Sequence, residues 1–490
     1  MSDAPLYLEP RLSAAMTSLL RSGPFLQSLV AALGSPLNVM LPDQIVLNLE
    51  VFRSVLRRHQ LSGRFFFAHK ANRSSALVRR LTTTDAGLDA ASIGELQHAL
   101  GCGFTADKVM ATGPKDPEFL WLAARAGAIV HVDGLGELTA AAGFVRTYGL
   151  PRLRVLLRLS GCETSGARTL SRTSRFGTSF KALGRLLDTL QYFKDELEPI
   201  GVGYHLDTTG LDEKAAALEG CLLAVEELRL RGFRPRAVDV GGGFGVSYLA
   251  HAEQWERYTT ALTQAVMGAR SPMTWGGHGY GLRAENGTLK GALGLYPAFR
   301  PVAGAGYLDE LLSCPAPRLD RPLGTLLLES LCDLYAEPGR AAVDQCGVTL
   351  GTVLEVREAG GGPPMVRLAL NSGDIGLEQH GILVDPVLLR RDGTTPATAS
   401  GRPVGVHLAG NLCLESDLIT RRTVFLPALP QPGDLLAFSN TAGYCMDFTA
   451  TAAQQQPSAR RVAVWEEGGS WRWCLDERYW PVLDTGGQRA

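Results

Sequence analysis

The stretch Phe65-Phe66-Phe67-Ala68-His69-Lys70-Ala71-Asn72-Arg73 decides the fold of this chain. Three aromatic residues followed by an alanine are typical of a buried strand, and a lysine follows that strand directly. A charged amine at the end of an interior strand costs free energy unless it is compensated, and a desolvated amine is a good nucleophile toward an aldehyde. Taken alone, the stretch favours the simpler interpretation, a lysine whose amine reaches solvent.

Short apolar runs alternate with helical patterns along the chain from about residue 46. Eight of these runs predict strands, at residues 65–69, 87–90, 109–112, 129–132, 154–159, 201–206, 237–240 and 331–336. Each of the first seven is followed by helical periodicity or by a helix-start signal, such as the capping box Ser92-Ile93-Gly94-Glu95. Strands that alternate with helices in this way predict a parallel (β/α)8 barrel of the TIM type.

The pattern changes after Glu337 to short β-like runs separated by glycine, proline and aspartate turns. We therefore predict two domains. Residues 46–336 form the barrel, with an insertion around residues 270–325. Residues 1–45 join residues 337–490 in an all-β domain of the sandwich or barrel type.

The composition is nearly neutral, with 48 lysines and arginines against 49 acids and a net charge of −1. This balance argues against a nucleic-acid partner or a membrane partner. The nine cysteines are scattered without a CxxC pair or zinc-ligand spacing, which indicates free thiols in a reducing compartment and no metal site. The sequence contains no signal-peptide pattern and no apolar run long enough to cross a bilayer, so we expect a cytoplasmic protein.

Glycines and polar residues follow two of the predicted strands. The glycine run in Asp239-Val240-Gly241-Gly242-Gly243-Phe244-Gly245 exposes backbone N–H groups without Cβ atoms and can hold a phosphate. A tight turn explains that run equally well when it is considered alone. The segment Glu337-Pro338-Gly339-Arg340 combines an acid with a cation suited to an anion, but a surface ion pair has the same pattern.

Four further segments carry polar residues at or beyond the ends of predicted elements. They are Ser174-Arg175-Phe176-Gly177, His205-Leu206-Asp207-Thr208-Thr209, the segment 410–417 around Cys413, and Thr441-Ala442-Gly443-Tyr444. A single histidine at a strand end is more often a satisfied core residue than a functional one. A cysteine is likewise more often buried and inert than reactive.

Taken in order, these segments resemble the fold-type III pyridoxal-phosphate (PLP) enzymes, the group of diaminopimelate, ornithine and arginine decarboxylases and alanine racemase. The decarboxylase branch fits better, and within it the sequence is similar to the Y4yA family. The matching segments cover nearly the whole chain: AHKAN (68–72), LDAASIGEL (88–96), MATGPK (110–115), LLRLS (156–160), SRFG (174–177), GYHLD (203–207), VDVGGGFG (238–245), EPGR (337–340), the Cys413 segment and AGY (442–444).

The resemblance implies a role for each matching residue. Lys70 would bind PLP covalently, Glu337 would hydrogen-bond the pyridine nitrogen and keep it protonated, and His205 would stack on the ring. Cys413 would act in the partner subunit's site as the proton donor to the substrate carbon. The remaining matches would line the cofactor pocket or hold its phosphate: Asp89, Arg158, Gly241, Gly242, Gly243, Gly339, Arg340 and Tyr444. Asp89 and Arg158 could equally be caps of strand ends.

The sequence departs from the family pattern at three places. Family decarboxylases have an acid directly after the cysteine, where this chain has Leu414, and Glu415 comes one position later. On a strand that shift would turn the carboxylate to the opposite face, so we do not expect a standard diamino-acid substrate. The segment after His205 also differs from the family's His-Ile-Gly-Ser. Arg73 adds a cation close to the lysine, and we hypothesise that it recognises a second anionic group on the substrate.

The interval between Gly245 and Glu337 spans 92 positions (337 − 245), which is longer than the resemblance predicts. It contains a segment rich in glycines and aromatic residues, 275–281, and Tyr296. Long loops in compact domains are usually either functional or disordered, and the aromatic residues favour a function here, as a lid or part of the substrate pocket. Tyr280 is its candidate substrate contact.

The resemblance implies a PLP-dependent carboxy-lyase that removes the carboxylate of an amino acid through an external aldimine and a quinonoid intermediate. The substrate would be an unusual, conjugated or carrier-linked amino acid, and the enzyme a head-to-tail homodimer with shared active sites. One alternative is a racemase or epimerase with Tyr444 as its second base, against which Cys413 argues. The other is a catalytically silent PLP-binding regulator, which would need neither Lys70 nor Glu337.

Overall fold

A computed structural model describes residues 5–161, 174–206, 208, 210–392 and 403–481 of the chain. It divides the chain into two compact units. Unit 1 comprises Met1–Gln44, Val246–Pro301 and Val343–Tyr479, and unit 2 comprises Ile45–Gly245, Val302–Ala342 and Trp480–Ala490. Each unit is built on its own sheet.

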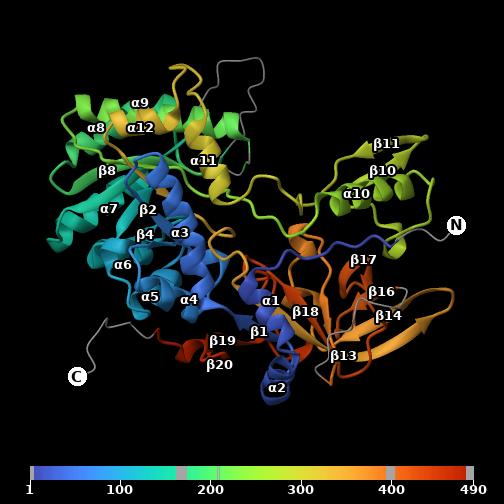
Figure 1. Cartoon of the computed structure of the whole chain (residues 1–490). Coiled ribbons are helices and arrows are strands. Elements are labelled where there is room, and N and C mark those ends of the chain that lie inside the picture. Colours follow the sequence, from blue (N-terminus) through green and yellow to red (C-terminus); the bar gives the residue numbers. More distant parts are fainter. Residues whose placement is uncertain (1–4, 162–173, 207, 209, 393–402, 482–490) are drawn as a thin grey trace. The chain divides into compact units, whose positions relative to one another are not determined.

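Unit 2 contains a closed barrel of eight parallel strands, as the alternation of strands and helices predicts (Figure 1). In chain order the strands are β2 (Gly63–Ala68), β3 (Gly87–Ala90), β4 (Val109–Ala111), β5 (Ile129–Val132), β6 (Leu153–Ser160), β8 (Leu197–Tyr204), β9 (Ala237–Asp239) and β12 (Asp333–Ala336). The spatial order is β5-β4-β3-β2-β12-β9-β8-β6, pairing of β5 with β6 closes the barrel, and the short β7 (Thr178–Ser179) adds to β6. Apolar side chains from six strands, among them Phe66, Met110 and Leu156, fill the interior, so the barrel has a packed core.

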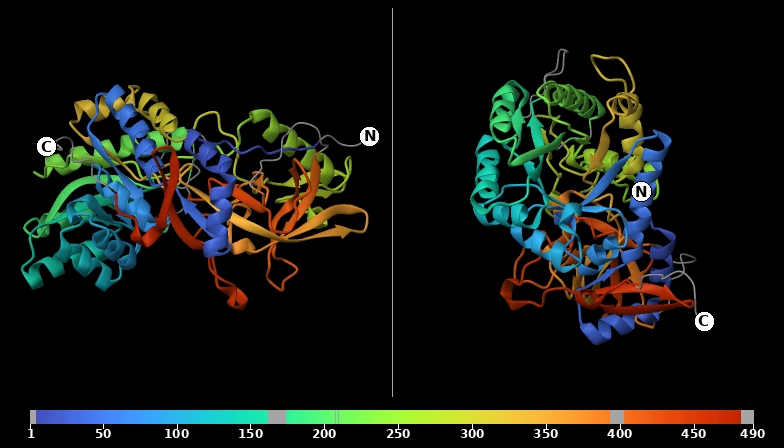
Figure 2. Two further views of the ribbon diagram at one scale, coloured as in Figure 1. Left: turned by 60° about the horizontal axis from the view of Figure 1, so that its bottom comes forward. Right: turned by 90° about the vertical axis from the view of Figure 1, so that its left-hand side faces the viewer.

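Helices cover the outside of the barrel strands (Figures 1 and 2). They are α3 (Pro42–Arg58), α4 (Ser75–Thr82), α5 (Ile93–Gly101), α6 (Pro117–Ala126), α7 (Leu135–Tyr148), α8 (Leu183–Tyr192), α9 (Leu211–Leu230), α11 (Ala305–Ser313) and α12 (Leu323–Glu329). Ser74, Ser92 and Asp116 accept N–H groups of the first turns of α4, α5 and α6, which fixes where these helices begin. The predicted capping box is half formed, since Glu95 accepts the N–H of Ala91.

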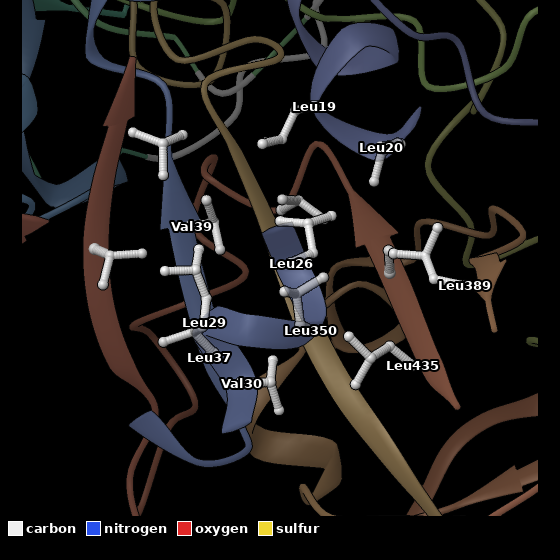
Figure 3. Packing of buried hydrophobic residues seen from close by; sticks show 14 of the residues in the cluster. Leu19, Leu20, Leu26, Leu29, Val30, Leu37, Val39, Leu350, Leu389 and Leu435 are labelled. Atoms are coloured by element: carbon white, nitrogen blue, oxygen red, sulfur yellow. The ribbon is translucent and has the colours of Figure 1, made fainter. Parts of the chain in front are cut away.

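Unit 1 is built on a mixed sheet in the order β17-β16-β14-β13-β1-β19-β20, with β18 paired to β13 and β15. The strands are β1 (Leu37–Met40), β13 (Gly347–Ala359), β14 (Gly362–Leu368), β15 (Val387–Leu389), β16 (Val404–Ala409), β17 (Leu418–Leu426), β18 (Leu435–Ser439), β19 (Arg460–Glu467) and β20 (Ser470–Leu475). Two helices, α1 (Ala14–Arg21) and α2 (Gly23–Leu33), pack their leucines against this sheet. Figure 3 shows Leu26 beside Leu350 and Leu29 beside Leu37, in a core that ties the N-terminal segment to the β domain.

The long interval after Gly245 is shared between the two units, and this differs from the predicted insertion at 270–325. Residues 246–301, with α10 (Ala252–Val266), β10 (Leu282–Glu285) and β11 (Thr288–Gly291), cluster with the β sheet of unit 1, whereas residues 302–342 lead through α11 and α12 into the barrel. The Tyr280 hydroxyl donates a hydrogen bond to Glu378 at 3.0 Å, and Thr274 pairs with Arg422 of β17. These pairings join residues about a hundred positions or more apart, which sequence periodicity does not report.

Two features of the composition can be checked in the described residues. None of their helices has both the length and the apolar character that crossing a membrane requires. Their eight cysteines are free thiols, and Cys162 lies outside the described residues.

Candidate active site

Chemically active side chains gather at the carboxyl ends of the barrel strands. Lys70 lies in a short 3-10 turn (His69–Ala71) directly after β2, and Glu337 follows the neighbouring strand β12. Asp89, His131 and Asp239 lie on β3, β5 and β9, and His205 follows β8. In a parallel barrel all these strand ends meet at one face, which is where barrel enzymes place their active sites.

Glu337 is the centre of this cluster and is almost fully buried. Its Oε2 lies 3.0 Å from Nδ1 of His205, and its Oε1 lies 3.7 Å from Nδ1 of His131. Its backbone N–H donates to the carbonyl of Gly241 at 2.9 Å. Burial alone would raise the pKa of Glu337, but the two histidines outweigh burial and hold this pKa well below its usual range. Glu337 is therefore a buried carboxylate that stays ionised.

Asp239 lies beside Glu337 and, unlike Glu337, is protonated. Its pKa is raised well above the usual value, first by burial and then by the negative charge of Glu337, although Gly241 donates its N–H to Oδ1 at 2.8 Å. Two adjacent buried carboxyl groups cannot both ionise, so Asp239 holds a proton next to the ionised Glu337. With His131 they offer ligand atoms within 4.8 Å of one another. A metal ion would require Asp239 to lose its proton, whereas a cationic N–H group would need only the Glu337 carboxylate.

Asp89 is buried near Lys70. The Thr112 hydroxyl donates to its Oδ1. Burial and the charge of Glu337 raise the pKa of Asp89 to about 7, while Lys70 and Thr112 oppose that rise. Three buried atoms of the cluster have no hydrogen-bond partner among the described residues: Asp89 Oδ2, His131 Nε2 and Asp239 Oδ2. Buried polar atoms are nearly always paired, so these atoms indicate a place for a polar ligand.

The glycine run forms a turn packed between the end of β8 and Glu337. Gly241 and Gly243 have positive φ values of 63° and 88°. A Cβ atom on Gly241 would lie 2.5 Å from the carbonyl oxygen of Tyr204, and one on Gly242 would lie 3.0 Å from that of Glu337. Only glycine fits these positions, and the bare backbone N–H groups suit a phosphate.

The remaining predicted barrel residues lie near these strand ends. Arg158 on β6 pairs with Asp133 at 3.5 Å and stacks over the ring of Phe176 at 4.8 Å. Gly339 and Arg340 lie in the turn after Glu337, where the carbonyl of Gly339 accepts the N–H of Ala342 at 3.1 Å. Arg73 is exposed between the 3-10 turn and α4. Asp207 and Thr209 lie outside the described residues.

The predicted residues Cys413, Glu415, Tyr444 and Tyr280 belong to unit 1. Cys413 is exposed in a loop, where its N–H donates to Gln454 at 2.9 Å. The carboxylate of Asp417 organises this loop by accepting the N–H groups of Leu412 and Ser372, both at 2.8 Å.

Three of these unit 1 residues have surroundings that bear on the roles predicted for them. Glu415 lies in a turn, so the argument from alternating strand faces does not apply to it. Tyr280 is buried with its hydroxyl on Glu378, and Tyr444 has a positive φ of 71° and packs its ring against Phe448.

Three residues of the cluster were given no role by the sequence analysis. His131 lies inside an apolar strand, Asp239 precedes the glycine run, and Thr112 follows β4. The sequence signal for His131 was its polar side chain within an otherwise apolar strand, where an apolar residue would be expected. Its contact with Glu337 depends on strand order, which local sequence does not contain.

Comparison with known proteins identifies the family. The family model described as "Pyridoxal-dependent decarboxylase, pyridoxal binding domain" matches residues 43–289. The uncharacterized protein y4yA of Sinorhizobium fredii is 30% identical over 469 residues, 94% of each chain. The chain belongs to the pyridoxal-dependent decarboxylase family.

Two further relatives place the chain within that family. Ornithine decarboxylase of Schizosaccharomyces pombe is 32% identical over 201 residues, 40% of this chain and 44% of that one. Diaminopimelate decarboxylase of m. jannaschii, solved in complex with L-lysine, covers 89% of both chains with a TM-score of 0.65 and 19% identity. This last likeness concerns the fold, and it agrees with the predicted barrel and β domain.

The cofactor of the family is PLP, and the site fits it. The glycine turn offers backbone donors that a phosphate can use, at positions where Cβ atoms would clash. The ionised Glu337 is suited to a protonated ring nitrogen, and Lys70 is an amine that can bind an aldehyde. The buried atoms without a partner in the described residues, on Asp89, His131 and Asp239, are suited to further polar contacts with a ring bearing oxygen and nitrogen atoms.

A methyl group on the glycine turn is expected to weaken PLP binding. In Gly241→Ala the new Cβ would press on the Tyr204 carbonyl in a backbone conformation that alanine adopts poorly, so the turn must shift. We expect at least about a tenfold rise in the Kd for PLP, measured by absorbance titration of apoprotein. Gly184→Ala, on α8 with no atom within 4 Å of the new Cβ, is the control and should leave Kd unchanged. Equal Kd values for the two variants would contradict the assignment of the glycine turn (residues 241–243) as the phosphate cradle.

Proposed function

We propose that this protein removes the α-carboxylate of an amino acid, or of an amino-acid conjugate, as CO2. The observation that supports the proposal most strongly is the placement of Lys70 and a buried, ionised Glu337 directly after two adjacent strands of the barrel. An amine at this position can bind an aldehyde, and an ionised acid can keep a ring nitrogen protonated. Either residue alone would have a simpler structural explanation.

Each residue would have a defined task in this reaction. When bound, PLP supplies the aldehyde that takes up an amine and the ring that accepts the electron pair left by CO2. Lys70 would hold that aldehyde group through its Nζ and release it to the amine of the substrate. The Glu337 carboxylate would hold the proton on the ring nitrogen, while His205 and His131 keep Glu337 in its ionised state. Asp89, with a pKa of about 7, can hold or release a proton close to Lys70.

The proposal extends to Cys413 and to a homodimer. Protonation of the substrate carbon after loss of CO2 requires a donor, and we assign this role to Cys413 of the partner subunit in a head-to-tail dimer. The thiol is exposed, on a loop that Asp417 holds by two backbone hydrogen bonds. Arg340, Gly339 and Tyr444 would add phosphate contacts, as their positions in the family pattern imply.

The substrate is proposed to lack the distal ammonium group of diamino acids. The position after Cys413 carries Leu414, whose side chain is 56% exposed and cannot pair with an ammonium. Arg73 presents an exposed cation three residues after Lys70, which suits a distal carboxylate or phosphate. Glu415 and Tyr280 remain weaker candidates for substrate contact.

A screen for CO2 release tests this function. Purified protein loaded with PLP would be incubated with amino acids and their acidic and acylated conjugates, with Lys70→Ala as the blank. We expect CO2 from at least one acidic or conjugated substrate and less from ornithine or diaminopimelate. Exchange of the α-proton into solvent without CO2 would instead indicate a racemase. A protein that binds PLP but catalyses neither reaction would be a regulator.

A further inference from the structure

Lys214, on the first turns of α9, is a buried lysine behind the glycine turn. Its side chain is 0% exposed. Its Nζ donates a hydrogen bond to the carbonyl oxygen of Gly242 at 2.6 Å. The rings of Phe244 and Tyr307 flank the ammonium at 5.1 and 5.2 Å, and the Tyr204 hydroxyl donates to the backbone carbonyl of Lys214 at 3.2 Å. The amine is therefore held in place from several sides.

Burial of the Lys214 ammonium costs free energy unless neighbouring groups compensate its charge. Within the described part of the chain no carboxylate pairs with Lys214, and one backbone carbonyl and two aromatic faces compensate a cation only in part. Burial lowers the pKa of Lys214 to about 8, so the amine is still mostly protonated at neutral pH. A buried cation without an acid is a favourable neighbour for a bound anion.

The contact with Gly242 also orients the turn. In a trans peptide the C=O of Gly242 and the N–H of Gly243 belong to one plane and point in opposite directions. A bond from Lys214 to that carbonyl therefore turns the Gly243 N–H toward the far side of the turn and polarises it. Gly243 is exposed, and its N–H makes no hydrogen bond to any residue that the structure describes. A Cβ on Gly243 would lie 2.7 Å from the Lys214 amine, so a side chain there would displace it.

We infer that Lys214 is a positioning residue for the PLP phosphate, which fixes the Gly242–Gly243 peptide as a donor and places a positive charge behind the cradle. Lys214 reaches the phosphate through the peptide and does not contact it. The inference rests on the use of PLP by this protein. It predicts that Lys214 favours PLP over pyridoxal, the same ring without its phosphate, because the effect of Lys214 acts on the phosphate alone.

The test compares the affinities of Lys214→Met apoprotein for PLP and for pyridoxal with those of wild type. Methionine fills nearly the same volume without the charge, and absorbance titration gives both Kd values. We expect the Kd for PLP to rise about tenfold or more and the Kd for pyridoxal to change less than twofold. Inorganic phosphate should also compete less with PLP in the variant. Lys108→Met is the matched control, since Lys108 also donates to a backbone carbonyl, that of Thr84, just before β4.

The outcomes separate this inference from the proposed function. If wild type binds no PLP, the proposed function fails. If wild type binds PLP and Lys214→Met binds it equally well, or loses PLP and pyridoxal to the same extent, the role of Lys214 is refuted. Should Lys214→Met fail to fold by circular dichroism, Lys214→Gln keeps a donor for Gly242 without the charge. A smaller loss of selectivity for PLP over pyridoxal is then expected, from the missing charge alone, and its absence would refute the role of the charge.

Discussion

Lys70→Ala is expected to lower kcat/KM for CO2 release by a factor of about 10⁴ or more, because it removes the amine that we propose binds the cofactor aldehyde. The small side chain should be tolerated, since Lys70 is only partly buried at the end of β2. Borohydride reduction and mass spectrometry of the peptide containing residue 70 provide a second measurement. Wild type should carry the mass of reduced PLP on Lys70, and the variant should carry none there.

A lysine elsewhere in the barrel provides the control for Lys70. Lys108→Ala removes a lysine that precedes β4, at the end of the barrel away from the site, and should keep both the activity and the mass on Lys70. If reduced PLP were found on another lysine in wild type, the central assignment would be wrong. A Lys70→Ala protein with a tenth of the wild-type activity would have the same consequence.

The barrel could be predicted because its signals are local. Seven of the eight predicted strands are short apolar runs followed by a helical pattern or a helix-start signal, and Ser92 caps α5 as its capping-box position indicates. The candidate residues could be placed at one face because parallel strands share an end, so Lys70 and Glu337 required only the order of strands along the chain.

The parts of the site that the sequence did not predict depend on long-range contacts, which sequence periodicity does not record. His131 gains its role from Glu337, 206 positions later (337 − 131), and only the closed barrel brings the two together. Lys214 resembles any helix lysine in the sequence, yet the fold points it at Gly242. The argument that Glu415 would point to the opposite face of a strand does not apply, because the Cys413 loop is a turn that depends on Asp417 and on Ser372 of another segment. In each case the decisive interaction is a long-range hydrogen bond or ion contact.

Glu337→Gln is expected to lower kcat by about 10²–10³ while the Kd for PLP changes less than about threefold. Glutamine matches glutamate in size and can occupy the same space between His131 and His205, but its neutral amide cannot stabilise a proton on the ring nitrogen. The effect should therefore appear in kcat and in the visible spectrum of the bound cofactor. Glu219→Gln is the control, because Glu219 is also a buried acid, accepting the N–H groups of Arg318 and Leu319, and its loss should leave kcat within twofold.

The same substitution has a pH signature whose sign follows from the depressed pKa of Glu337. The unfolded chain protonates this group near its ordinary pKa of 4.5, whereas the folded protein protonates it only at lower pH. Between these two values the unfolded state binds the additional proton, so the ionised carboxylate stabilises the fold above pH 4.5 and this contribution is lost as pH falls. Urea unfolding of the apoprotein between pH 7 and about pH 3 should therefore show a steeper acid loss in wild type than in Glu337→Gln. Parallel acid profiles with an unchanged kcat would mean that Glu337 is protonated in the fold, and the cofactor nitrogen would then need another partner.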